Sequence, residues 1–150
     1  MNKPKSLRAA LVAALPALGE SPERLQVFIE QGKIAPAAES SLAFKYQYTC
    51  ELLILDFTGH SDQIMVPLLA WARDNEPDLF RSDANQISFE AELLSNSVVD
   101  LIIKVPLTER VGVTENDTGI AEVRHLPERT QRDAIGVPLR EVWLRDEKIE

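Results

Sequence analysis

The chain has 150 residues, 45% hydrophobic and 27% charged, with a formal net charge of −8. This length allows one domain with a real core, while the acidic balance argues against a sequence-independent nucleic-acid-binding protein, which needs clustered lysine and arginine. One cysteine excludes an internal disulfide framework, and the short apolar run at 9–18, broken by Pro16, predicts neither a secretory signal nor a membrane span.

The first predicted element is a helix from Pro4 or Ser6 to about Leu15. Its apolar side chains recur at helical spacing; they are Leu7, Ala10, Leu11, Ala14 and Leu15. Three positive side chains at its first turn oppose the helix dipole, because the N-terminus of a helix favours negative charge. Two explanations stay open: solvated side chains, or a basic patch that faces an acidic partner.

Two neighbouring strands come next. Leu25–Glu30 is predicted as a strand, Gly32 as a turn or bulge, and residues 35–41 as a loop of small residues. A long strand from Phe44 to Phe57 follows, and antiparallel pairing of the two strands is the simplest arrangement. The long strand begins polar on one of its faces and ends apolar on both, which predicts that it enters an interior covered on both sides.

A turn and a helix follow the long strand. Asp56 to Gly59 is predicted to turn the chain, and Ser61 or Asp62 to cap a helix that ends near Asn75. Pro67 requires that this helix either begins near Val66 or kinks. Its predicted buried residues are Ile64, Met65, Leu68, Leu69 and Ala72, with Trp71 on the flank as a core residue.

The remaining segments alternate in polarity. Ile87–Leu93 and Val99–Leu107 form the clearest hairpin, and Pro106 places the end of its second strand at an edge or bulge. Beyond Gly112 the chain becomes polar and rich in turns, with a short strand at Ile120–Leu126 and a last hairpin within Pro138–Ile149. We therefore expect an α+β fold: a mixed, largely antiparallel sheet with two main helices packed on it and an extended C-terminal arm or hairpin.

The sequence offers little chemistry. His60 and His125 have no metal-ligand spacing, and Cys50, in the middle of a strand, is interpreted as a buried structural thiol. Asp56 and Asp62 flank the turn, where capping explains them more simply than an acid–base pair; a buried Asp56 would need the backbone amides of residues 58–61. No phosphate-binding loop or nucleophile elbow is present. We predict no catalytic residue, no cofactor and no metal.

A set of residues in the first 110 positions resembles the phage tail completion protein R (GpR) family of contractile-tailed temperate phages. The order and spacing of the set carry the resemblance, which covers roughly residues 3–110. Its members are Phe44, Tyr48-Thr49, Asp56-Phe57-Thr58-Gly59, Val66-Pro67, Leu69-Ala70-Trp71, Arg73, Asn75, Pro77-Asp78 and the stretch from Asp100 to Thr108-Glu109-Arg110.

The resemblance implies a virion structural protein that is not an enzyme. Such a protein caps the tail tube and sheath, stops their polymerisation and joins the tail to the head connector. Its role is similar to that of tail terminators that form sixfold rings, so a homo-oligomeric ring, a hexamer, is implied. DNA could cross such a ring without specific binding, and the protein would lie in the tail or neck of the virion after assembly in the bacterial cytoplasm.

We expect a single tail-completion domain over residues 1–150, with a core at about 1–110 and an arm at about 111–150. A ring requires a heterologous interface, in which one surface meets a different surface on the neighbour. The arm could add a strand to a neighbour's sheet. The predicted interface residues are Val66, Ala70, Arg73, Glu109, Arg110 and Trp143.

Two alternatives stay open at this point. The protein could act in head completion as a head–tail connector. It could also be a small cytosolic α+β enzyme or ligand-binding protein, for which Asp56, His60 and Asp62 would be the best residues.

Overall fold

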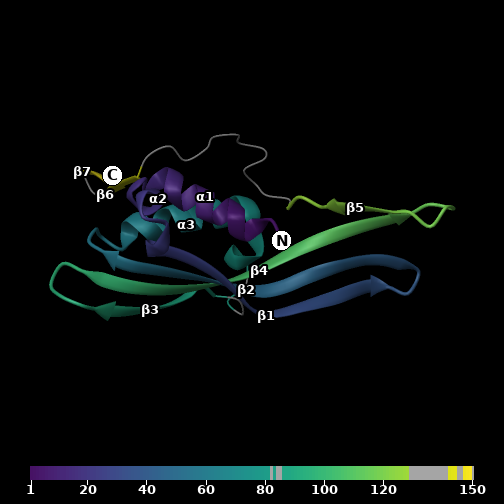
Figure 1. Cartoon of the computed structure of the whole chain (residues 1–150), viewed down its shortest axis with the longest axis horizontal. Coiled ribbons are helices and arrows are strands. Elements are labelled where there is room, and N and C mark those ends of the chain that lie inside the picture. The colour runs from purple at the N-terminus through teal and green to yellow at the C-terminus, as the bar shows by residue number, and fades with distance from the viewer. Residues whose placement is uncertain (82, 84–85, 129–141, 145–146, 150) are drawn as a thin grey trace.

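The structure is a computed structural model that describes residues 1–81, 83, 86–128, 142–144 and 147–149, the last two segments by their backbone alone. Three α-helices lie in the described part, and they are α1 (Lys3–Ala14), α2 (Ala17–Glu20) and α3 (Asp62–Asn75). Short 3-10 turns follow α2 at Pro22–Arg24 and α3 at Pro77–Phe80. The helices gather on one side of a twisted sheet (Figure 1).

The described strands form one large sheet and one small hairpin. The strands are β1 (Leu25–Ala38), β2 (Ser41–Phe57), β3 (Ser88–Leu93), β4 (Val99–Glu115), β5 (Ala121–His125), β6 (Val142–Leu144) and β7 (Glu147–Ile149). The order in the sheet is β1-β2-β4-β3, with β5 also paired to β4, while β6 pairs with β7. Every described pairing is antiparallel, so the α+β prediction is confirmed and no parallel pair is found in this part of the chain.

The ladder between β2 and β4 forms the centre of the sheet. It runs from the pair Phe44–Val111 to the pair Ile54–Leu101 without a shift of register. β1 flanks β2 and is interrupted between Glu30 and Lys33, where Gln31 has a positive φ of 53°. The predicted turn or bulge at Gly32 is therefore a bulge, and the predicted loop over 35–41 is wrong, because the strand continues to Ala38.

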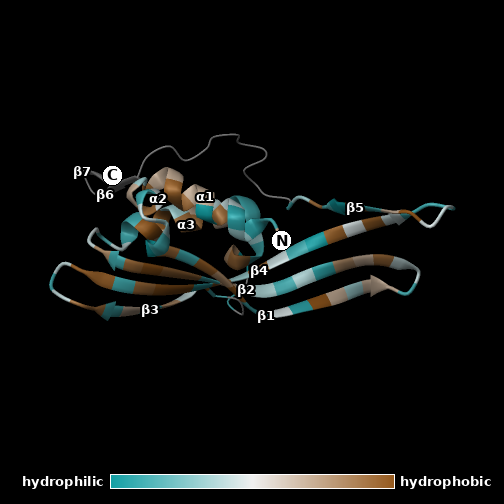
Figure 2. Ribbon diagram, in the orientation of Figure 1, coloured by the Kyte–Doolittle hydropathy of each residue, from teal (hydrophilic) through white to brown (hydrophobic). Residues whose placement is uncertain are grey.

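The hydrophobic core lies between the helices and one face of this sheet (Figure 2). The strand side chains in it alternate along β2 and β4, as a half-covered sheet requires. They are Tyr48, Cys50, Leu52, Ile54, Leu101, Ile103, Val105 and Leu107. On the other face of the sheet Leu53 and Ile102 are only half-buried, so the predicted interior covered on both faces is wrong.

Helix α1 packs its leucines on the core, while α3 differs from its prediction in three respects. It begins at Asp62 despite Pro67, so the later start near Val66 is wrong. Ser61 gives no side-chain cap; instead His60 Nδ1 accepts a hydrogen bond from the Asp62 amide. Leu69, expected in the buried stripe, is 45% exposed, whereas Trp71 is buried as predicted and donates to Ser6 Oγ at 2.9 Å.

The turn before α3 also differs from its prediction. Asp56 is exposed, with a φ of 52°, and its amide donates to Asp100 Oδ1 at 2.8 Å. It is therefore not the buried carboxylate that backbone amides would have to satisfy. Gly59 has no positive φ; a Cβ there would clash with Gln63 Oε1 and lie 2.8 Å from the Phe57 ring, so these side chains would have to shift.

The predicted hairpin of β3 and β4 is confirmed, but β4 continues well beyond it. β3 pairs with β4 as far as Lys104, and β5 takes up the same edge from Val111 onwards. Between these points the edge has no strand partner in the described part of the chain. The carbonyl of Arg110 faces this edge. Every second residue of a strand directs its backbone groups to the same edge, so the backbone nitrogen of Pro106 faces it too. Proline is tolerated at this position because it has no N–H to offer a neighbouring strand.

Four strand segments extend past the helices as a sheet, which we call the β arm. Its parts are residues 33–38, 41–47, 109–115 and 121–125. Figure 1 shows them to the right of the helices. The predicted short strand after Ile120 is confirmed as β5. The division into a core at about 1–110 and an arm at about 111–150 stays a prediction; β4 runs through this boundary, and half of the β arm comes from β1 and β2.

Candidate functional site

The predicted interface residues of α3 lie on its outer side. Val66 is 39% exposed, Arg73 is exposed and Ala70 is half-buried. The exposed Leu69 joins them, and together we call these four residues the α3 stripe. It is an apolar strip with one cation, a composition found at protein interfaces, where arginine is enriched.

The other three predicted interface residues have different environments. Arg110 is exposed and donates to the Pro127 carbonyl at 3.2 Å. Glu109 points to the opposite face of β4 and is 5% exposed. Trp143 belongs to β6, and its side chain lies outside the described part of the chain.

Glu109 is the centre of a buried polar network at the base of the β arm. Its Oε2 accepts a hydrogen bond from the Tyr48 hydroxyl at 2.5 Å, and its Oε1 accepts from the Asn2 amide at 2.7 Å. The Lys3 amide adds a longer bond, and His125 Nδ1 lies 3.8 Å away. The carboxylate thus satisfies amides at the start of α1 that the helix itself leaves without a partner.

This geometry determines how the two side chains titrate. Burial acts to raise the pKa of Glu109, but the hydrogen bonds from Tyr48 and from the Asn2 and Lys3 amides outweigh it, so the pKa lies below its ordinary value. Burial first, and then the bond to Glu109, raise the pKa of the Tyr48 phenol far above its ordinary value. The pair is therefore held as a neutral phenol that donates to a carboxylate.

Glu76 is a second buried carboxylate and joins three parts of the fold. It follows α3, is 4% exposed, and accepts a hydrogen bond from Thr108 Oγ1 at 2.7 Å. The Lys3 ammonium pairs with it and also with Glu128 at 3.2 Å. The explanation of solvated side chains at the first turn of α1 is therefore wrong for Lys3, whose acidic partners belong to its own chain.

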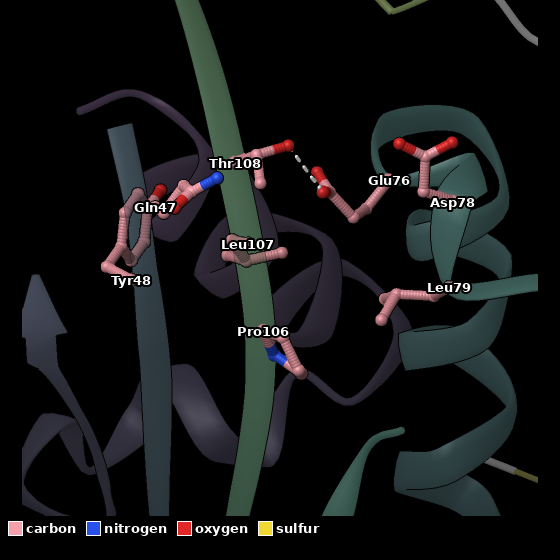
Figure 3. Close-up of a pocket in the computed structure, with 8 residues that line it drawn as sticks. All are labelled: Gln47, Tyr48, Glu76, Asp78, Leu79, Pro106, Leu107 and Thr108. Atoms are coloured by element: carbon pink, nitrogen blue, oxygen red, sulfur yellow. Dashed lines mark hydrogen bonds between the residues drawn. The ribbon is translucent and has the colours of Figure 1, made fainter. Parts of the chain in front are cut away.

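A hollow lies beside this second carboxylate, between β2, β4 and the chain after α3 (Figure 3). It is lined by Gln47, Tyr48, Glu76, Asp78, Leu79, Pro106, Leu107 and Thr108. Its ionisable groups have structural partners: Tyr48 donates to Glu109, Glu76 pairs with Lys3, and Asp78 pairs with Arg81 at 3.2 Å. The hollow does not bring together the acid, base or nucleophile in defined roles that catalysis requires.

Of the other candidate residues for chemistry, His60 and Asp62 meet in an exposed pair, and Cys50 lies apart from them in the core. Cys50 is fully buried, and burial raises the pKa of its thiol to about 11, which suits a structural residue. His60 is exposed and pairs with Asp62 at 3.5 Å. In the described part of the chain no group of three or more side chains could hold a metal ion, and no helix is long and apolar enough to cross a membrane.

The polar network around Glu109 was not predicted from the sequence, although one signal was present. Glu109 occupies an apolar position in the alternation of β4, between Leu107 and Val111. A carboxylate among inward-facing residues requires partners. The identity of those partners was not predictable, because Tyr48 and Asn2 come from elements that only the folded chain brings to Glu109.

Removing the Tyr48 hydroxyl should destabilise the fold. In Tyr48→Phe, a buried oxygen of Glu109 loses its phenol donor, and we expect the free energy of unfolding to fall by about 1–3 kcal/mol. Urea denaturation measures this value. Tyr46→Phe is the matched control two residues along β2, because its hydroxyl has no hydrogen-bond partner among the described residues. Equal effects of the two substitutions would contradict a specific role for Tyr48.

The stability of the protein should depend on the ionisation of Glu109. Because its pKa is lower in the folded state, its contribution is present above the ordinary carboxyl pKa of about 4.3 and is lost as the pH falls through the folded value. Glu109→Gln should therefore lose less stability between neutral and acid pH than the wild type does. Urea titrations over this range test this, with exposed Glu92→Gln as control; parallel curves for Glu109→Gln and the wild type would exclude this contribution.

Comparisons with known proteins agree with the resemblance of the sequence. A relative named tail completion protein R, from Escherichia phage P2, is 36% identical over 152 residues, which cover 99% of this chain and 97% of the relative. No solved structure gives a significant match. The profile of the family described as P2 phage tail completion protein R (GpR) matches residues 1–129. This family is structural, in agreement with the prediction that the protein is not an enzyme. The chain belongs to the P2 phage tail completion protein R (GpR) family.

Proposed function

We propose that this protein completes a phage tail. In this role it caps the tail tube and sheath, stops their polymerisation and presents a surface to the head connector. The observation that carries the proposal is the similarity, over nearly the full length of both chains, to tail completion protein R of Escherichia phage P2. The protein is accordingly a component of the virion tail or neck and is assembled in the bacterial cytoplasm.

The distribution of its chemistry supports a structural role. The buried ionisable groups hold α1, α3 and β4 together, and the hollow beside them presents groups that already have structural partners. Apolar side chains, by contrast, are exposed on the α3 stripe, and clustered exposed apolar surface is typical of a protein interaction site.

The active form is a homo-oligomeric ring, a hexamer, that contacts the tail tube, the sheath and the head connector. A ring requires that two unlike surfaces of one chain meet on neighbouring copies. We assign the subunit contact to the α3 stripe and to Arg110, and we keep Trp143 as a predicted contact residue; Glu109 has its partners within the chain. A net charge of −8 would let DNA cross the ring without adhering to it.

Deleting the gene from the phage should leave tails that do not end correctly. We expect overlong or headless tails in electron micrographs of the resulting particles, because nothing would stop tube and sheath growth or connect the tail to the head. Supplying the wild-type gene in trans should restore complete particles. Normal, infective particles without the protein would contradict the proposal, and complete tails beside unfinished heads would indicate a role in head completion.

Charges placed on the α3 stripe should weaken assembly. In Val66→Glu/Leu69→Glu, two exposed apolar side chains become carboxylates that an interface would have to bury. We therefore expect a higher dissociation constant of the oligomer, measured by sedimentation velocity. Ala9→Glu/Ala13→Glu makes the same change on exposed positions of α1 and should sediment as the wild type. Identical oligomers of both variants would remove the α3 stripe from the subunit contact.

A further inference from the structure

The face of the β arm that points away from the helices is basic, although the protein is acidic. The register places Lys45 of β2 directly opposite Arg110 of β4. Gln47, two residues further along β2 and therefore on the same face, lies opposite Lys33 of β1. Arg124 of β5 lies opposite Gly112, on the same face. We call Lys33, Lys45, Arg110 and Arg124 the basic row.

The basic row is not neutralised within the described part of the chain. Like charges directly opposite each other on a sheet repel, and the Lys45–Arg110 pair is an instance of this. Lys33, Lys45 and Arg124 form no ion pair among the described residues, and the hydrogen bond of Arg110 goes to a backbone carbonyl. The carboxylate of Glu122 lies on the same face, opposite Thr114 and nearer the tip of the β arm.

The same face of the sheet is acidic where it continues below the helices. Glu30 on β1 and Glu51 on β2 point this way, as do Glu90 and Glu92 on β3. We call these four residues the acidic end. A hydrogen bond with Glu30, then burial and the negative charges of Glu30 and Glu90, raise the pKa of Glu51 against the opposing charge of Lys104, so these three carboxylates lie close together. Lys104 lies among them and reaches Glu30 at 4.0 Å.

The two charge sets are separated along a continuous strand. Lys45 of the basic row and Glu51 of the acidic end are six positions apart on β2, which corresponds to roughly 20 Å of extended chain. For these members the separation exceeds the distance of about 8–10 Å over which surface charges act at physiological salt. Lys33 lies nearer to Glu30, because their partners Gln47 and Thr49 are two residues apart on β2. Both sets also point to the same side of the sheet, so the basic row of one molecule cannot close onto its own acidic end without breaking the ladder.

We propose that the basic row of the β arm docks on the acidic end of a second copy of this chain. The contact joins two unlike surfaces, as a ring requires, and its opposite charges favour this register over contacts between two arms or two acidic ends. The inference rests on the proposed homo-oligomer and specifies which surfaces meet in it. A nucleic acid is the less suitable partner, because its phosphates would also approach the adjoining acidic end and a chain of net charge −8.

Charge reversal on each side, and then on both sides together, tests the proposal. Lys45→Glu/Arg110→Glu should raise the dissociation constant of the oligomer on the order of 100-fold, and so should Glu90→Lys/Glu92→Lys, because each brings like charges together. The protein with all four substitutions restores opposite charges and should associate within about tenfold of the wild type. Sedimentation velocity at low and at physiological salt measures these values, and circular dichroism confirms that each variant is folded.

Lys5→Glu/Arg24→Glu is the matched control, because it makes the same charge change at exposed positions of the helical layer and should leave assembly unchanged. If the wild type associates and the two double variants associate equally well, the docking surface is refuted while the ring stands. A wild type that remains monomeric at every concentration refutes the ring and the docking together. Binding of a DNA duplex that is lost in Lys45→Glu/Arg110→Glu, with self-association unchanged, would assign the basic row to nucleic acid instead.

Discussion

The ladder between β2 and β4 is the constraint on which the rest of the structure depends. It fixes an unbroken register from the pair Phe44–Val111 to the pair Ile54–Leu101 and so decides which side chains share a face. A slip of one residue would turn every side chain of one strand to the other face. The same register that buries the core beneath the helices also sets the charges of the uncovered face.

The buried carboxylates explain how the helical layer is fixed to this ladder. Glu109 binds the first amides of α1, while Glu76 connects the end of α3 with Thr108 and with Lys3. Buried carboxylates cost free energy unless they are paired and hydrogen-bonded, and both of these are. Glu109 and Glu76 therefore have a structural role, because they join α1, α3 and β4, and they need no catalytic explanation.

A tail completion protein must recognise other subunits. The sheet suits this task because its uncovered face is basic at one end and acidic at the other. The basic row and the acidic end lie on one face, and the unshifted ladder of β2 and β4 connects them. A rigid element of this kind can hold a neighbour in a single orientation. The α3 stripe offers a separate apolar surface on the helical layer (Figure 1). Charge is suited to selecting the partner and its register, and apolar burial to stabilising the contact once formed.

Periodicity in the sequence predicted most of the elements, because alternation and helical spacing are local properties. It indicated α1, α3, the hairpin of β3 and β4, β5 and the buried role of Trp71, and the ordered motifs indicated the family. It did not predict that β1 continues past its bulge to Ala38, because alanine and proline have little strand propensity and their pairing comes from β2.

Only the tertiary structure decided what surrounds each side chain. Leu69 is exposed because it lies on the side of α3 away from the core, and Leu53 is half-buried because the helices cover only the other face of the sheet. Glu109 is buried because Tyr48 and the start of α1 meet it from distant parts of the chain. The basic row exists only in the register of four strands, since its members are spread from Lys33 to Arg124. The sequence by itself determined the strands and helices and the family; long-range pairing, which no local pattern encodes, determined the surfaces with which the protein can assemble.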